Sequence, residues 1–260
     1  MRAGSSVLVL QHIACEPPGV YADVMLERGI ALHPVELDED EPLPDWRAYG
    51  ALLVMGGPMG SYDEVEHPWL VAEKRCIREA VSAGRPFFGA CLGSQLLAAS
   101  LGAGVYRCEP EVGVLDVELT AAGREDPVMG GLPPSFATLQ WHGDTFDLPS
   151  GAVRLAGSPA YPNQAFRVGS TAYAVQFHLE VTSGMAAEWA TVPSYARALE
   201  EVRGPGALDE LLTAFEDRRD EMHRHARHLF TRWLETWAEP GRARAAQSRI
   251  ECRVTEPQAE

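Results

Sequence analysis

The stretch Phe87–Gln95, FFGACLGSQ, places a single cysteine between two glycines. An isolated cysteine is more often a buried packing residue than a nucleophile. Here Gly89 and Gly93 give the form of a nucleophile elbow, the sharp strand-to-helix turn that lifts a reactive side chain above the edge of a sheet. Small residues suit that strained backbone, and the free amides of the following helix favour the thiolate. The pattern therefore predicts that Cys91 is a nucleophile.

A histidine and a glutamate follow a second apolar run, in AYAVQFHLEVT. Residues Ala172–Phe177 have the composition of a strand, His178 ends it, and Glu180 lies two residues further on. In an extended segment, residues two apart point to the same face. A carboxylate placed there can orient an imidazole while the other ring nitrogen reaches a thiol. We expect Cys91, His178 and Glu180 to form a catalytic triad.

A glycine pair ends a third apolar run, in VMGGPMGS. A turn at the carboxyl end of a parallel strand points backbone amides into the crevice where open α/β sheets bind ligands. Gly57 in this turn and Leu92, the residue after the cysteine, are expected to supply the amides of an oxyanion hole. Taken alone, the segment also fits a plain tight turn. The glycine spacings of dinucleotide and phosphate loops are absent, so no cofactor is predicted.

Four segments together resemble the class I glutamine amidotransferases, whose glutaminase domains carry a Cys-His-Glu triad. GACLGSQLLA resembles the cysteine motif of that family, VMGGPMGS its oxyanion loop, QWHGDTF its glutamine-pocket segment, and VQFHLEVT its histidine and glutamate motif. The segments occur in the family's order and spacing, over residues 7–189. They look closest to the amidotransferase domain of GMP synthetase and to stand-alone relatives of it.

The resemblance implies a reaction and a role for each matching residue. Cys91 would attack the side-chain amide of glutamine and form a γ-glutamyl thioester. His178 would protonate the departing ammonia and then activate water, while Glu180 orients His178. Backbone amides of Gly57 and Leu92 would stabilise the oxyanion. Three further residues would hold the glutamine substrate, namely Gln95, Gly143 and Asp144.

The sequence departs from the family pattern at two positions of these motifs. Leu179 stands where the family usually has proline, and Ser94 stands where histidine or another residue is common. Either change would alter the pocket without removing an atom of the triad. His142, within the pocket segment, is expected to form the pocket wall or lie behind it rather than act as a competing base. No synthetase segment is recognised after Trp189, so we do not expect a complete GMP synthetase.

Three functions fit these residues. In the first, a glutaminase passes ammonia to a separate synthetase or acceptor enzyme, which would be its protein partner. In the second, the chain works alone as a γ-glutamyl hydrolase or peptidase that cleaves γ-glutamyl amides. In the third, it is a non-catalytic binding or regulatory module on the same fold. The intact triad favours an enzyme with a small-molecule substrate, and we expect the first function.

The elements that must position these residues alternate between strand and helix, as in parallel βαβ units. We therefore predict an α/β fold with an open, mostly parallel sheet flanked by helices, of the flavodoxin-like type that the resemblance implies. Helices are expected at 20–28, at 69–83 and after Cys91. The expected strands are 7–10, 32–35, 51–55, 86–89, 104–119, 136–141, 164–168 and 171–177, the last two as a hairpin.

From residue 184 the chain becomes helical and more charged. Apolar residues between Leu208 and Trp237 predict one long helix or two. We expect a single domain over residues 1–239, with 184–239 as its helical extension. Residues 240–260 lack a sustained period, and we expect them to form a disordered tail.

Composition excludes several classes of partner. The 260 residues carry a formal net charge of −15, which disfavours nucleic acids and anionic membrane surfaces. Five cysteines without paired spacing indicate a reducing compartment, and no signal peptide is recognised, so we expect a cytoplasmic protein. In HRHARH only His225 and His228 share a helix face, and no carboxylate completes a ligand set, so no metal is predicted.

Overall fold

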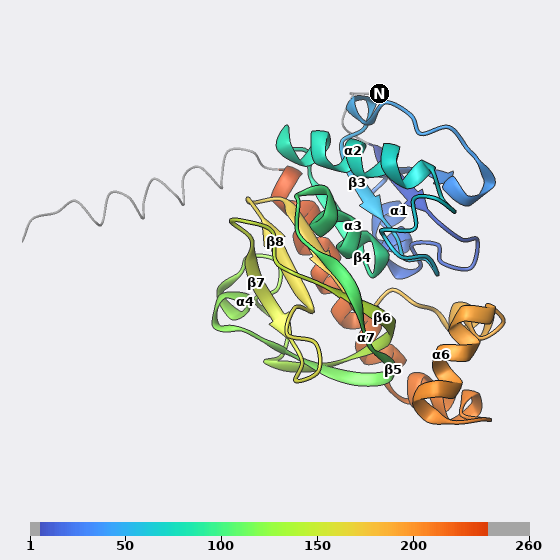
Figure 1. Cartoon of the computed structure of the whole chain (residues 1–260). Helices are drawn as coiled ribbons and strands as arrows, with labels where there is room; N and C mark the ends of the chain where they lie inside the picture. Colours follow the sequence, from blue (N-terminus) through green and yellow to red (C-terminus); the bar gives the residue numbers. More distant parts are fainter. Residues whose placement is uncertain (1–5, 239–260) are drawn as a thin grey trace, which may run out of the picture.

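The computed structural model describes residues 6–238. A nine-stranded sheet runs through the molecule in the order β2-β1-β3-β4-β9-β8-β7-β5-β6. Helices lie on both sides of it (Figure 1), so the predicted α/β fold is confirmed. The strands are β1 (Ser6–Gln11), β2 (Ala31–Glu36), β3 (Ala51–Val54), β4 (Phe87–Ala90), β5 (Val105–Leu119), β6 (Ser135–Phe146), β7 (Val153–Gly157), β8 (Ala165–Val168) and β9 (Ala172–Val175).

The sheet has two halves of different character. Strands β2, β1, β3, β4 and β9 pair in parallel. Strands β8, β7, β5 and β6 continue the sheet through antiparallel pairs. The description as mostly parallel therefore fits only the half that contains β4 and β9. In this half β3, β4 and β9 are buried along their whole length, as expected where helices cover both faces.

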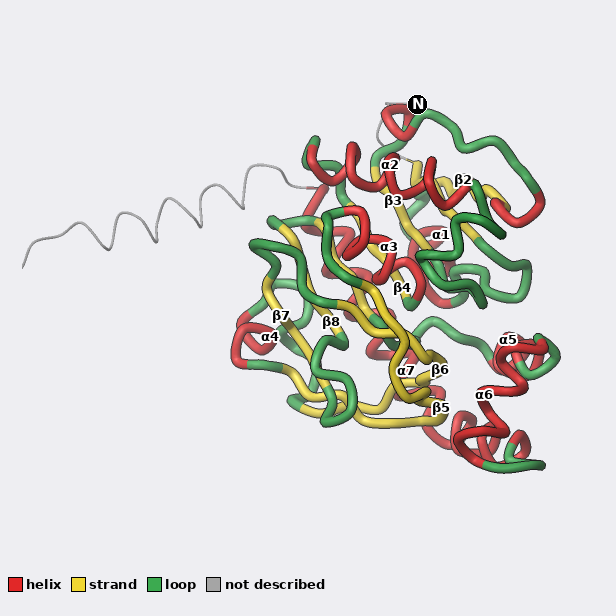
Figure 2. Tube along the Cα trace, viewed as in Figure 1, coloured by secondary structure: helices red, strands yellow, loops and turns green. Residues whose placement is uncertain are grey.

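The helices form a layer on each face of the parallel half. Figure 2 shows them in red around the yellow strands. One buried cluster joins alternate residues of β1 and β3 to α1 and α7, and a second cluster joins the intervening residues to α2 and α3. The helices are α1 (Val20–Glu27), α2 (Trp69–Ser82), α3 (Leu92–Ser100), α4 (Ala121–Glu125), α5 (Ser183–Trp189), α6 (Pro193–Arg203) and α7 (Leu208–Ala238).

The long segment near the C-terminus is one helix, α7, rather than two. Its side chains Phe230 and Trp233 pack against Phe88 of β4, with ring centroids 5.4 and 5.5 Å away. Tyr21 of α1 stacks on Phe230 at 4.6 Å. All four rings are buried, and each contributes about 1.5–3 kcal/mol on removal from water. The helical extension is therefore part of the core.

The sequence analysis did not predict helix α4 or strand β7. Helix α4 and strand β7 have five residues each, too few to show a period. The tail predicted for residues 240–260 lies outside the described residues. Among the helices of residues 6–238, none combines the length and the apolarity that crossing a bilayer requires.

Candidate active site

Cys91 occupies a sharp turn between β4 and α3. Its φ of 49° and ψ of −108° lie where residues other than glycine are rarely found. A Cβ on Gly89 would lie 2.5 Å from the carbonyl oxygen of Gly93, and one on Gly93 would lie 2.1 Å from that of Val54. Neither position accepts a side chain without movement of the backbone. The elbow therefore requires glycine at both positions, Gly89 and Gly93, as the sequence analysis predicted.

His178 and Glu180 form a buried pair. The Nδ1 atom of His178 lies 2.7 Å from Oε1 of Glu180, and each side chain is 1% exposed. Strand β9 ends at Val175, earlier than predicted, and His178 is held by a bridge to Leu139 of β6 instead. Two backbone hydrogen bonds of 2.9 and 3.0 Å make this bridge. The second oxygen of Glu180 accepts the amide N–H of Leu179 at 3.0 Å.

The electrostatics of His178 and Cys91 are coupled. Burial alone would lower the pKa of His178, but the carboxylate of Glu180 and a hydrogen bond to Cys91 raise it well above its ordinary value. Burial raises the pKa of the Cys91 thiol, and His178 acts in the opposite direction. A charged imidazole beside Cys91 is the condition under which a buried thiol can ionise.

In the described part of the chain, two backbone amides near Cys91 have no acceptor. The amides of Cys91 and Gly93 donate to carbonyls of Val175 and Met55, at 2.9 and 3.1 Å. Within residues 6–238 the amides of Leu92 and Gly57 donate to no protein atom. A Cβ on Gly57 would lie 3.1 Å from the Leu92 side chain, so the two residues are neighbours. The structure thus places the two residues predicted to supply these amides next to each other.

A cavity of about 190 Å³ opens at Cys91, a size that suits an amino-acid side chain and its backbone. The predicted substrate residues Gln95, Gly143 and Asp144 all line it. Arg107 also lines it, because β5 places this residue opposite Asp144 in the register with β6. Burial raises the pKa of Asp144, whereas Tyr62 and Arg107 act to lower it. Arg107 was missed by the sequence analysis, since no spacing links it to the motifs.

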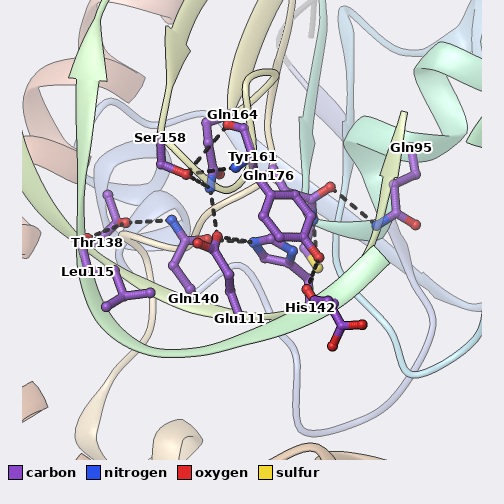
Figure 3. Close-up of polar contacts among 12 residues, drawn as sticks. Gln95, Glu111, Leu115, Thr138, Gln140, His142, Ser158, Tyr161, Gln164 and Gln176 are labelled. Atoms are coloured by element: carbon purple, nitrogen blue, oxygen red, sulfur yellow. Dashed lines mark hydrogen bonds and ion pairs between the residues drawn. The ribbon is translucent and has the colours of Figure 1, made fainter. Parts of the chain in front are cut away.

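Gln176 is a further residue that the sequence analysis missed. Its Nε2 donates to Sγ of Cys91 at 3.5 Å, and its Oε1 accepts from Nε2 of Gln95 at 3.2 Å (Figure 3). Gln176 therefore orients the predicted pocket residue Gln95 and contacts the predicted nucleophile. The alternation of Gln176, His178 and Glu180 along an extended segment is the signal that could have identified it.

His142 lines the cavity as a neutral imidazole. Its Nε2 lies 2.7 Å from Oε1 of Gln140, whose amide nitrogen donates to Thr138 at 2.9 Å (Figure 3). Because the amide nitrogen is committed to Thr138, the amide oxygen faces His142, and Nε2 carries the proton. Burial, with His178 nearby, lowers the pKa of His142 to about 3. This geometry is that of the predicted pocket wall.

Two buried carboxylates adjoin the site from outside the predicted motifs. The hydroxyl of Tyr195 donates to Glu16, and Tyr195 lines the cavity from α6. Burial raises the pKa of Glu16, while His178 and Tyr195 act in the opposite direction. Glu73 of α2 contacts His12, which in turn contacts the loop of Gly56. These partners lie far apart in the chain, so no local pattern could have identified them.

The three histidines of HRHARH do not gather with metal ligands. His225 packs edge-on against Phe136, with ring centroids 5.5 Å apart. Over the described range 6–238, no group of three or more His, Cys, Asp and Glu residues is placed to hold a metal ion.

Comparison with known proteins identifies the family. The sequence profile of the glutamine amidotransferase class-I family matches residues 21–189. The chain belongs to this family. The glutamine amidotransferase-like protein YfeJ of Salmonella typhimurium is 32% identical over 176 residues, 66% of this chain and 74% of that protein. One of the subunits of the glutamine-hydrolysing GMP synthase of Sulfurisphaera tokodaii is 30% identical, over 58% of this chain and 78% of that protein.

A solved structure supports the same assignment. The crystal structure of a glutamine amidotransferase from Thermotoga maritima superimposes with a TM-score of 0.79 at 33% identity. The match covers 88% of this chain and 98% of that one. The similarity to this glutamine amidotransferase therefore extends beyond the matched profile into the helical extension.

Proposed function

We propose that the chain hydrolyses the side-chain amide of glutamine to glutamate and ammonia. The observation that carries this proposal is the buried pair of His178 and Glu180, 2.7 Å apart, beside a cysteine on a strained elbow. Membership of the class I glutamine amidotransferases supports glutamine as the substrate.

In the proposed first step, Sγ of Cys91 attacks the amide carbon of glutamine, and the thiol proton passes to His178. The oxyanion accepts hydrogen bonds from the free amides of Gly57 and Leu92. As the C–N bond breaks, His178 gives its proton to the leaving nitrogen, which departs as ammonia. A γ-glutamyl thioester on Cys91 remains.

In the proposed second step, water attacks the thioester while His178 takes a proton from it. The C–S bond breaks, the sulfur regains a proton, and glutamate leaves. Glu180 stabilises the charged imidazole in both steps, because its Oε1 accepts from Nδ1 and leaves Nε2 free to exchange protons. One water is consumed for each glutamine, and no cofactor is needed.

The mouth of the cavity offers complementary charges for an amino acid. We assign the α-ammonium group of glutamine to Asp144 and the α-carboxylate to Arg107, which faces Asp144 across β5 and β6. Gly143 leaves room beside them, since the nearest atom to a Cβ there would be 3.7 Å away. Gln95 lines the deeper part of the cavity, near Cys91.

The proposed destination of ammonia is a separate acceptor enzyme. The similarity to a protein named as one of the subunits of GMP synthase supports a synthetase partner. The alternative is a stand-alone γ-glutamyl hydrolase, which needs space for a larger leaving group. Membership of the class I glutamine amidotransferases favours glutamine, with its small leaving group, over larger γ-glutamyl amides.

Ammonia release from glutamine and cleavage of γ-glutamyl dipeptides test this proposal, with Cys91→Ala as the blank. We expect glutamine turnover by the wild type and a loss of at least about 1,000-fold in the variant. Brisk dipeptide cleavage with little glutamine turnover would support the γ-glutamyl hydrolase instead. If neither substrate turns over and a glutamine-analogue electrophile fails to label Cys91, the chain is a non-catalytic module.

A further inference from the structure

A second buried histidine–glutamate pair lies behind the loop of Gly56 and Gly57. His12 follows the end of β1, and its Nε2 lies 2.9 Å from Oε1 of Glu73 on α2. Its Nδ1 lies 2.9 Å from the carbonyl oxygen of Gly56. The side chains of His12 and Glu73 are both 0% exposed. Trp69 stacks on the imidazole with ring centroids 5.5 Å apart, so the ring is fixed on three sides.

The hydrogen bonds determine where the protons lie. A carbonyl oxygen can only accept, so Nδ1 of His12 must carry a proton and donate it to Gly56. Glu73 then holds the other nitrogen. Burial alone would lower the pKa of His12, but the Glu73 carboxylate raises it above its ordinary value. An N–H donor, charged when the imidazole is protonated, is therefore directed at the Gly56 carbonyl.

This carbonyl belongs to the same peptide group as the amide of Gly57. No peptide bond in residues 6–238 is cis, and in a trans peptide the C=O and N–H bonds point in opposite directions. Holding the carbonyl on His12 therefore turns the N–H of Gly57 away from His12. A Cβ on Gly57 would lie 2.8 Å from Cβ of His12 and 3.1 Å from the Leu92 side chain. The loop is thus fixed between His12 and Leu92, the other proposed oxyanion donor.

We propose that His12 is a positioning residue that aims and polarises the amide of Gly57, with Glu73 fixing the imidazole. A hydrogen bond to the carbonyl of a peptide strengthens its N–H as a donor, the more so when the first donor is charged. His12 touches no substrate atom and acts through one peptide group. This inference rests on the proposed function, because the oxyanion forms only when Cys91 attacks an acyl group.

Three substitutions at His12 separate the direction of the donor from its presence. Asparagine places an amide nitrogen where Nδ1 lies, facing Gly56, whereas glutamine places one where Nε2 lies, facing Glu73. Leucine provides neither. We expect His12→Leu to lower kcat for glutamine about 10- to 100-fold with KM within about threefold, because the Gly57 amide is misdirected but still present. His12→Asn should regain at least a third of the wild-type kcat, and His12→Gln should remain near the leucine variant.

A second measurement distinguishes positioning from general damage to the site. Alkylation of Cys91 by iodoacetamide, followed by mass spectrometry of its peptide, requires the thiolate but no oxyanion hole. We expect its rate in the three variants to stay within about twofold of the wild type. His33→Leu, a change at an exposed histidine on β2, is the matched control and should alter neither measurement.

The inference is overturned if His12→Leu keeps the wild-type kcat, or if His12→Asn and His12→Gln lower kcat by the same factor. It is also overturned if the alkylation rate of Cys91 falls in parallel with kcat. If His12→Leu fails to fold, the comparison of kcat between His12→Asn and His12→Gln still tests the inference. Failure of the proposed function is seen separately. It would appear as a wild-type protein whose turnover of glutamine does not exceed that of Cys91→Ala.

Discussion

Two buried histidine–glutamate pairs flank the loop and turn around Cys91, and they differ in how far apart their two residues lie in the sequence. His178 and Glu180 are two residues apart, whereas His12 and Glu73 are 61 residues apart and come from a strand end and a helix. Besides its glutamate, the first imidazole contacts the thiol of Cys91, whereas the second donates a hydrogen bond to the backbone carbonyl of Gly56. In the proposed mechanism the local pair moves protons, and the long-range pair holds the backbone in position.

The two carboxylates also differ in how fully they are bonded. Both oxygens of Glu180 accept hydrogen bonds, from His178 and from the amide of Leu179. The second oxygen of Glu73 is buried and has no partner in the part of the chain that the structure describes. A carboxylate held by two donors keeps one orientation, which suits a group that must present an imidazole in one tautomer.

Breaking the local pair should have the largest effect. Glu180→Gln removes the charge that stabilises the imidazolium of His178 and can leave Nδ1 facing a donor, which favours the wrong tautomer. We expect kcat for glutamine to fall by about 10³- to 10⁴-fold with KM little changed. Steady-state ammonia release measures this. A variant that keeps more than about a tenth of the wild-type kcat would contradict the role assigned to Glu180.

Breaking the long-range pair should have a smaller effect. In Glu73→Gln, the glutamine amide can donate to Nε2 of His12 and leave Nδ1–H on Gly56, but the charge behind the loop is lost. We expect kcat to fall about tenfold, which corresponds to about 1.4 kcal/mol of transition-state stabilisation. The same ammonia assay measures it. A loss as large as that in Glu180→Gln would remove the distinction between the two pairs.

The contrast also explains what could be predicted from the sequence. The elbow around Cys91 and the alternation of His178 and Glu180 are short-range patterns. They can be recognised in the sequence because the geometry of a strand or a turn is set by a few neighbouring residues. Four strands of the parallel half, namely β1, β3, β4 and β9, were predictable because they are short apolar runs.

The remaining features depend on tertiary contacts. His12 meets Glu73 only because α2 packs beside the end of β1. Arg107 meets Asp144 only because the register of β5 and β6 places them opposite each other, just before an irregularity between Arg107 and Glu111. Neither contact leaves a periodic trace in the sequence, so spacing alone could not have revealed it.

The carboxyl group of Glu16 interacts electrostatically with both His178 and His12. Its burial is expected to make the stability of the protein depend on pH. Burial raises its pKa, while the charges of His178 and His12 act in the opposite direction. For an acid whose folded-state pKa is raised, the stability contribution is full below the unfolded pKa of about 4.3 and is lost as pH rises through the folded value. At pH values well above the unfolded pKa, the wild type therefore carries a free-energy cost for burying this carboxyl group.

Glu16→Gln removes that cost and can still accept the hydroxyl proton of Tyr195. We expect the variant to melt about 2–4 °C above the wild type at pH 8, equivalent to about 1 kcal/mol, with a smaller difference at pH 5. Scanning calorimetry at both pH values measures the change. A lower melting temperature at pH 8 would mean that the two imidazoles stabilise the Glu16 carboxylate by more than its burial costs.

The smallest effect is expected at Leu179, where the family usually has proline. The Leu179 amide donates to the second oxygen of Glu180 at 3.0 Å, and proline has no N–H to replace it. Since the first oxygen stays on His178, we expect Leu179→Pro to lower kcat only about threefold and to leave KM unchanged. Leu179→Ala is the control, because it removes the buried side chain but keeps the N–H. If Leu179→Ala lowers kcat as much as Leu179→Pro does, packing of the Leu179 side chain rather than the second hydrogen bond orients Glu180.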